Sequence, residues 1–69
     1  MTIETYNMTP ERLRSAAYLC GLRDQDYRGL AKHDLGEGRV TLSAGSENPG
    51  GERFLAIMIE RGWARRMPD

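Results

Sequence analysis

The side chains able to carry out chemistry are few and scattered along this chain. His33 is the only histidine, with Asp34 beside it, so the ligands that a zinc site needs are missing. Cys20 is the only cysteine, which excludes an internal disulfide. Asp24 and Asp26 lie on different faces of any helix that they share. We therefore expect no metal, no cofactor and no enzymatic activity, and a protein that works by binding.

Size and charge set limits on the binding partner. The 69 residues predict one domain near the lower size limit for independent folding, and a homodimer would cover apolar surface that one chain cannot cover. Ten basic residues balance ten acidic residues, which counts against DNA because phosphate contacts supply much of the affinity for DNA. Lys32 is the only lysine, and arginine favours forked contacts to carboxylate, phosphate or base edges.

No targeting or membrane segment is expected. The start Met-Thr-Ile-Glu lacks the pattern of a signal peptide, and the longest apolar run, residues 54–59, is too short to span a bilayer. A single cysteine suits a reducing compartment, so the sequence predicts a cytoplasmic protein that does not contact membranes.

Helical signals are strongest at two places. Thr9 is a good N-cap with Pro10 behind it, and the apolar spacing predicts a helix over residues 10–20 that places Cys20 in the core. Asn48 can cap a helix beginning at Pro49, whose apolar residues, Phe54 and Met58 among them, should be the most buried of the chain. A buried strand over residues 54–59 is the alternative. The apolar stripe after Asp24 predicts a further helix to about residue 35.

Two stretches are ambiguous. The first seven residues form either a frayed arm or a short strand. Residues 39–44 alternate apolar and polar side chains as a strand does, yet as the third element of a helical domain they would form one short helix with Val40 and Ala44 inward. We therefore expect an arm over residues 1–8, one domain over residues 9–63, and a polar tail over residues 64–69.

The order of these elements resembles that of small helix-turn-helix proteins of the Cro and phage-repressor type. Leu30 and Ala31 in a helix, a glycine turn at residues 36–38, the pair Arg39-Val40, and a capped apolar helix follow each other as in that family. The resemblance implies an all-α, compact four-helix helix-turn-helix domain. The alternative is an α+β domain in which two helices precede a short β-hairpin.

A DNA-binding transcription regulator is what the resemblance implies, acting as a homodimeric repressor on double-stranded DNA. The segment at residues 39–43 would then enter the major groove, with Arg39 reading guanine and the second helix contacting the backbone. The implied DNA-binding residues are Gln25, Arg28, Lys32, Arg39, Thr41 and Ser43. The chain departs from the family in its spacing from Ala31 to Gly36 and in Gly45, which would cut the recognition segment short. The alternative function is a small phage-type protein that binds and inhibits a host protein or nucleic-acid machine.

Overall fold

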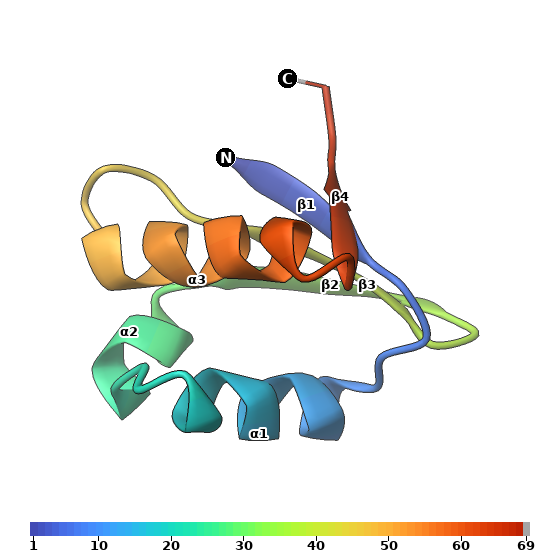
Figure 1. Cartoon of the computed structure of the whole chain (residues 1–69), viewed down its shortest axis with the longest axis horizontal. Coiled ribbons are helices and arrows are strands. Elements are labelled where there is room, and N and C mark those ends of the chain that lie inside the picture. The colour runs from blue at the N-terminus through green and yellow to red at the C-terminus, as the bar shows by residue number, and fades with distance from the viewer. Residues whose placement is uncertain (69) are drawn as a thin grey trace.

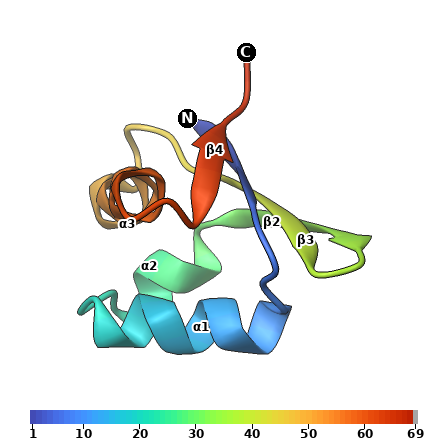
Figure 2. The ribbon, with the colours of Figure 1, turned by 45° about the vertical axis from the view of Figure 1, so that its right-hand side comes forward.

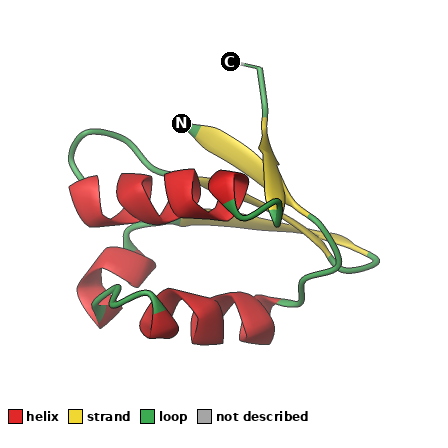
Figure 3. Ribbon diagram, in the orientation of Figure 1, coloured by secondary structure: helices red, strands yellow, loops and turns green. Residues whose placement is uncertain are grey.

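The computed structural model describes residues 1–68, which form four strands and three helices. In chain order these are β1 (Thr2–Thr5), α1 (Pro10–Leu19), α2 (Asp24–Arg28), β2 (Ala31–Gly36), β3 (Arg39–Ser43), α3 (Pro49–Glu60) and β4 (Ala64–Arg66) (Figure 1). The strands form one antiparallel sheet in the order β2-β3-β1-β4, with strands and helices mixed along the chain (Figure 3). The order matches a split β-α-β arrangement in which α1 and α2 share the first crossover.

The expected all-α helix-turn-helix fold is wrong, because the domain is α+β. The second helix ends at Arg28 instead of residue 35, and the stretch that follows pairs with Arg39–Ser43 as a β-hairpin. The two loop residues of this hairpin, Glu37 and Gly38, adopt φ values of 55° and 76°, which a two-residue hairpin turn needs and a helix cannot contain. The α+β alternative had the class right, but it lacked β1 and β4.

Segments near both termini belong to the sheet. Residues 2–5 form a strand, which confirms the strand alternative for the start, and β1 lies between β3 and β4. Residues 64–66, expected within a polar tail, pair with β1 as β4, and Asp69 lies outside the described residues. Pairing across such separations leaves no local signal in the sequence, since neither stretch has a turn or partner strand beside it.

The two capped helices are confirmed. The hydroxyl of Thr9 accepts a hydrogen bond from the Arg12 amide at the start of α1, and Asn48 caps α3 in the same way. Pro10 and Pro49 lie in the first turn of their helices. Backbone N–H groups in that turn make no hydrogen bond within the helix, so proline, which lacks an N–H, costs none there. No helix within residues 1–68 is both long enough and apolar enough to cross a membrane.

The core lies between one face of the sheet and the helices. Figure 2 shows the helices gathered on one side of the curved sheet. Phe54 and Met58 of α3 are 1% and 0% exposed, which confirms the prediction that they are among the most buried residues. Inward residues from the strands and from α1 complete the core, chiefly Ile3, Val40, Leu42, Ala64, Leu13 and Ala17.

Candidate functional site

The sheet has a second face that points away from the helices. Side chains alternate along a strand, so the neighbours of the buried Ile3, Val40 and Leu42 must point outward. The strand register brings outward positions from all four strands side by side. We call this surface the open face, and its residues are Thr2, Glu4, Ala31, His33, Arg39, Thr41, Ser43 and Arg65.

An acid held between two arginines forms the centre of the open face. Glu4 on β1 lies opposite Thr41 of β3 on one side and opposite Arg65 of β4 on the other. Its Oε2 lies 3.1 Å from an Arg39 Nη2 and 3.8 Å from an Arg65 Nη2, and Arg39 Nε donates to Oε1 at 3.3 Å. The Glu4 side chain is only 9% exposed, whereas those of Arg39 and Arg65 are 50% and 58% exposed.

The two guanidinium groups keep this carboxylate ionised. The pKa of Glu4 is lowered, first by the hydrogen bond from Arg39 and then by the positive charges of Arg39 and Arg65, against the opposing effect of desolvation. The same hydrogen bond raises the pKa of Arg39. The centre of the open face is therefore an ionised carboxylate between two positively charged guanidinium groups, with a net charge of one positive unit.

Hydroxyl groups extend the open face beyond this centre. The hydroxyls of Thr2 and Ser43 lie 3.0 Å apart on adjacent strands, and the Thr41 hydroxyl donates to the carbonyl of His33 at 3.4 Å. Tyr6, 46% exposed, follows the buried Thr5, and its amide continues the ladder by donating to the Trp63 carbonyl. The surface is thus polar and partly aromatic at one end.

The structure divides the six predicted DNA-binding residues between two sides of the domain. Arg39, Thr41 and Ser43 share the open face, as alternate residues of β3 do. Gln25 and Arg28 lie on α2, in the helical layer, where Arg28 pairs with an Asp24 oxygen at 2.8 Å. Lys32 points to the same side as the helices, and its Nζ lies 4.0 Å from the centroid of the Tyr27 ring.

The expected recognition helix at residues 39–43 is a strand, so these residues cannot insert into a groove as a helix does. The sequence reasoning also missed Glu4 and Arg65, which complete the centre of the open face. They lie at opposite ends of the chain, and only the pairing of β1 with β4 brings them together. No spacing rule along the sequence could have joined them.

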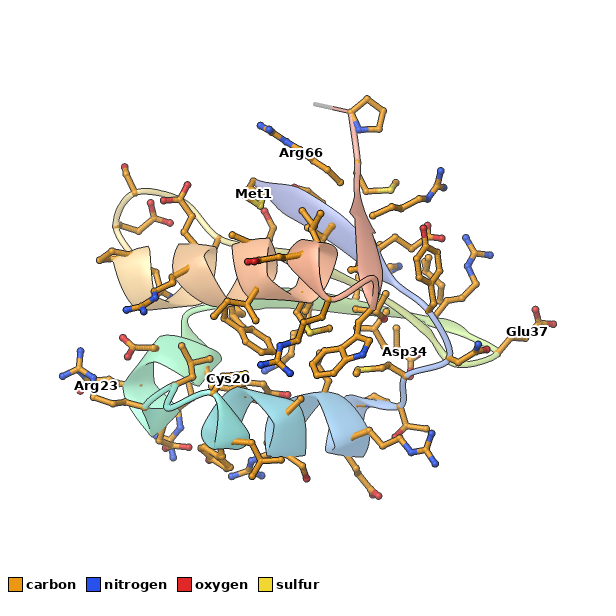
Figure 4. The ribbon with its side chains drawn as sticks, in the orientation of Figure 1. Met1, Cys20, Arg23, Asp34, Glu37 and Arg66 are labelled. Atoms are coloured by element: carbon orange, nitrogen blue, oxygen red, sulfur yellow. The ribbon has the colours of Figure 1, made fainter. Side chains whose placement is uncertain are left out.

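A small pocket lies on the helical side of the domain, between the end of α1 and α3. Its volume is about 180 Å³, and Leu22, Phe54 and Ile57 supply apolar lining while Asp26 and Arg53 supply charge. Cys20 borders it and is exposed, so the expectation of a buried cysteine is wrong (Figure 4). The helix ends at Leu19, and as its C-cap Cys20 no longer follows the helical spacing that predicted burial. Leu19 beside it is 89% exposed.

These features define an α+β domain with a helix-covered face and an open polar face. Within residues 1–68, no three His, Cys, Asp or Glu side chains gather in a group that could hold a metal ion. Comparisons of the chain with protein-family models, with curated proteins and with solved structures found no match.

Proposed function

We propose that this chain is a protein-binding regulator of the inhibitor type, and that its open face docks on the partner protein. The observation that carries the proposal is the central Glu4, held between Arg39 and Arg65 on a face that no helix covers. A fold of this kind serves many unrelated functions, so the chemistry of the surface is what supports the proposal.

The same centre disfavours a nucleic acid as the partner. A sheet that binds single-stranded RNA stacks bases on aromatic side chains, and here the outward positions of the two central strands, β1 and β3, hold none: they are Thr2, Glu4, Arg39, Thr41 and Ser43. The rings of His33 and Tyr6 lie only at the margins of the open face, on the edge strand β2 and beyond the end of β1. Phosphate groups would meet the ionised Glu4 between the two arginines. The chain also has no net charge, so it lacks the long-range attraction that steers nucleic-acid binding.

A protein surface with both acidic and basic groups fits this face better. Arginine is enriched in protein interfaces, where its planar head contacts carboxylates and aromatic rings. The two hydrogen bonds from Arg39 to Glu4 hold the Arg39 guanidinium in place before binding, which reduces the conformational entropy lost on docking. The surrounding hydroxyls of Thr41 and Ser43 can donate or accept hydrogen bonds.

Site-specific photocrosslinking tests the proposal. A photoreactive amino acid is placed at Thr41 on the open face, at Ser15 on the exposed side of α1 as a matched control, and at Leu19 on the exposed apolar end of α1. We expect one protein to crosslink through Thr41 and not through Ser15. The captured protein, purified, should bind the wild-type chain and lose affinity on the order of tenfold or more for Thr41→Arg, while Ser15→Arg leaves the affinity unchanged.

Two results would contradict the proposal. Capture through Leu19 and not through Thr41 would move the interface to the helical side. Alternatively, a titration with double-stranded and single-stranded DNA and RNA could give a saturable, sequence-dependent complex that Thr41→Arg alters and Ser15→Arg does not. In that case the open face binds nucleic acid, as the residues of β3 first indicated.

A further inference from the structure

The outer edge of β2 is unpaired in this chain. Within residues 1–68 this strand pairs with β3 alone, at the end of the sheet, and all six of its residues are exposed. A strand edge of this kind presents backbone N–H and C=O groups that can pair with another strand. Which groups face outward follows from the hydrogen bonds of β3.

The backbone groups of Lys32 and Asp34 point to this free edge. The Val40 amide donates to Thr5 Oγ1 at 3.2 Å, and the Val40 carbonyl accepts from the same oxygen at 3.1 Å, so both point to β1. In an antiparallel ladder the direction alternates with each residue, so Leu42 also points to β1. The residues opposite these two, Asp34 and Lys32, therefore have no ladder bonds to β3 and turn their N–H and C=O outward.

The spacing of these two residues makes the edge complementary to itself. When two copies of β2 pair antiparallel about a two-fold axis at His33, Lys32 of each copy lies opposite Asp34 of the other. Each such pair exchanges two N–H···O bonds between the outward backbone groups and also brings opposite charges together. Pairing centred on Lys32 or on Asp34 would instead place like charges directly opposite.

For the opposite charges to meet, the side chains of Lys32 and Asp34 must lie on the same face of β2, and they do. Lys32 and Asp34 are two residues apart, so they share one face of the strand, and Lys32 Nζ over the Tyr27 ring identifies it as the helical side. Asp34 Oδ1 accepts from the Gly36 amide at 2.8 Å, which fixes the carboxylate at the hairpin end (Figure 4). A lone edge lysine commonly prevents strand pairing, but here an aspartate two residues later matches it.

We propose that β2 joins a second copy of this chain, so that two four-stranded sheets form one continuous sheet with both open faces on the same side. The ladder irregularity between Asp34 and Gly36 limits the regular stretch to a few residues, which makes the association weak and reversible. This inference goes beyond the proposed function, because it uses the strand edge and not the open face. Either can fail while the other holds.

Exchanging the charges tests the register directly. Lys32→Asp gives an edge with two acids, and Asp34→Lys gives an edge with two bases. In sedimentation velocity from about 10 µM to about 1 mM, we expect wild-type chain to dimerise and each variant alone to associate on the order of tenfold more weakly. An equimolar mixture of the two variants should recover dimerisation, because each acid then meets a base.

Matched controls separate strand pairing from general charge attraction. Arg12→Asp and Glu11→Lys make equivalent charge changes on the exposed side of α1, and both variants, alone or mixed, should dimerise as wild type does. Circular dichroism checks that every variant is folded. Wild-type chain that stays monomeric at about 1 mM, or a Lys32→Asp and Asp34→Lys mixture that gains nothing, overturns the proposal.

Hydrogen exchange gives a second measurement that needs no substitution. The amides of Lys32 and Asp34 should exchange fast in dilute wild-type protein and become protected at high concentration. The His33 amide, which points to β3, should be protected at both concentrations. Equal exchange of Lys32 and Asp34 at both concentrations, in a sample that does dimerise, would place the interface elsewhere and refute the β2 pairing.

Discussion

Replacing Asn48 by alanine is expected to lower the free energy of unfolding by about 2–4 kcal/mol, because one side chain serves two helices. Its Oδ1 accepts from the Gly51 amide at 3.0 Å and caps α3, while its Nδ2 donates to the Asp26 carbonyl of α2 at 2.8 Å. Losing an N-cap costs about 1 kcal/mol, and leaving the Asp26 carbonyl without this partly buried partner costs about 1–3 kcal/mol. Asn48 is 8% exposed, so water replaces neither bond easily.

Two variants separate these contributions. Asn48→Ser keeps an oxygen at the cap but is too short to reach Asp26, so it should lose only the second contribution. Asn48→Asp keeps the cap and adds a favourable charge at the helix N-terminus, yet it turns an acceptor toward the Asp26 carbonyl. We expect alanine to be the most destabilising of the three, with serine at about 1–3 kcal/mol.

Gly29 provides an independent check on the position of this amide. A Cβ added to Gly29 would lie 2.7 Å from Asn48 Nδ2. The φ of Gly29 is −75°, which alanine adopts freely, so the contact with Asn48 is the main obstacle to a side chain here. Gly29→Ala should therefore destabilise the wild-type chain but be nearly neutral in the Asn48→Ala background. Such a difference is the coupling that a double-mutant cycle measures between residues in contact.

Urea unfolding followed by circular dichroism, at a concentration where the chain is monomeric, measures the free energy of unfolding of each variant. Thermal unfolding gives a second measurement. In a domain of this size each kcal/mol moves Tm by about 4–8 °C, so the Tm of Asn48→Ala should be lower on the order of 10–30 °C. If the alanine and serine variants unfold with the same free energy within about 0.5 kcal/mol of wild type, neither bond stabilises the domain and the reasoning is refuted.

Three further predictions concern the core, the cysteine and the open face. Phe54→Ala should cost about 3–5 kcal/mol in urea unfolding, enough to unfold much of the protein, and an unchanged midpoint would mean that the core is misplaced. Cys20 should react with a thiol reagent in the native state as fast as a free thiol, and Cys20→Ser should shift stability by no more than about 0.5 kcal/mol; slow labelling would contradict its exposure. Because the pKa of Glu4 is lowered from 4.5 by Arg39, ionised Glu4 should stabilise the fold above about pH 4.5 and lose this effect as the pH falls below it. Glu4→Gln should flatten this dependence between about pH 6 and pH 3, and an unchanged acid profile would exclude Glu4 as its source.

Local signals predicted both capped helices. Thr9 before Pro10 and Asn48 before Pro49 act within one helical turn, because a side-chain oxygen bonds an amide three residues along the chain. The same locality explains the error at β2. The stripe formed by Tyr27, Leu30 and Ala31 matched helical spacing, but an exposed edge strand has no apolar alternation that could have contradicted it.

By itself, then, the sequence determined where two helices begin and that Phe54 and Met58 are buried, since caps and helical periodicity depend on neighbours in the chain. Only the tertiary structure decided the sheet. Strand pairing joins residues that are far apart in the sequence, so Glu4 and Arg65 meet only when β1 and β4 align. The open face and the free edge of β2 both follow from the order of the strands in the sheet.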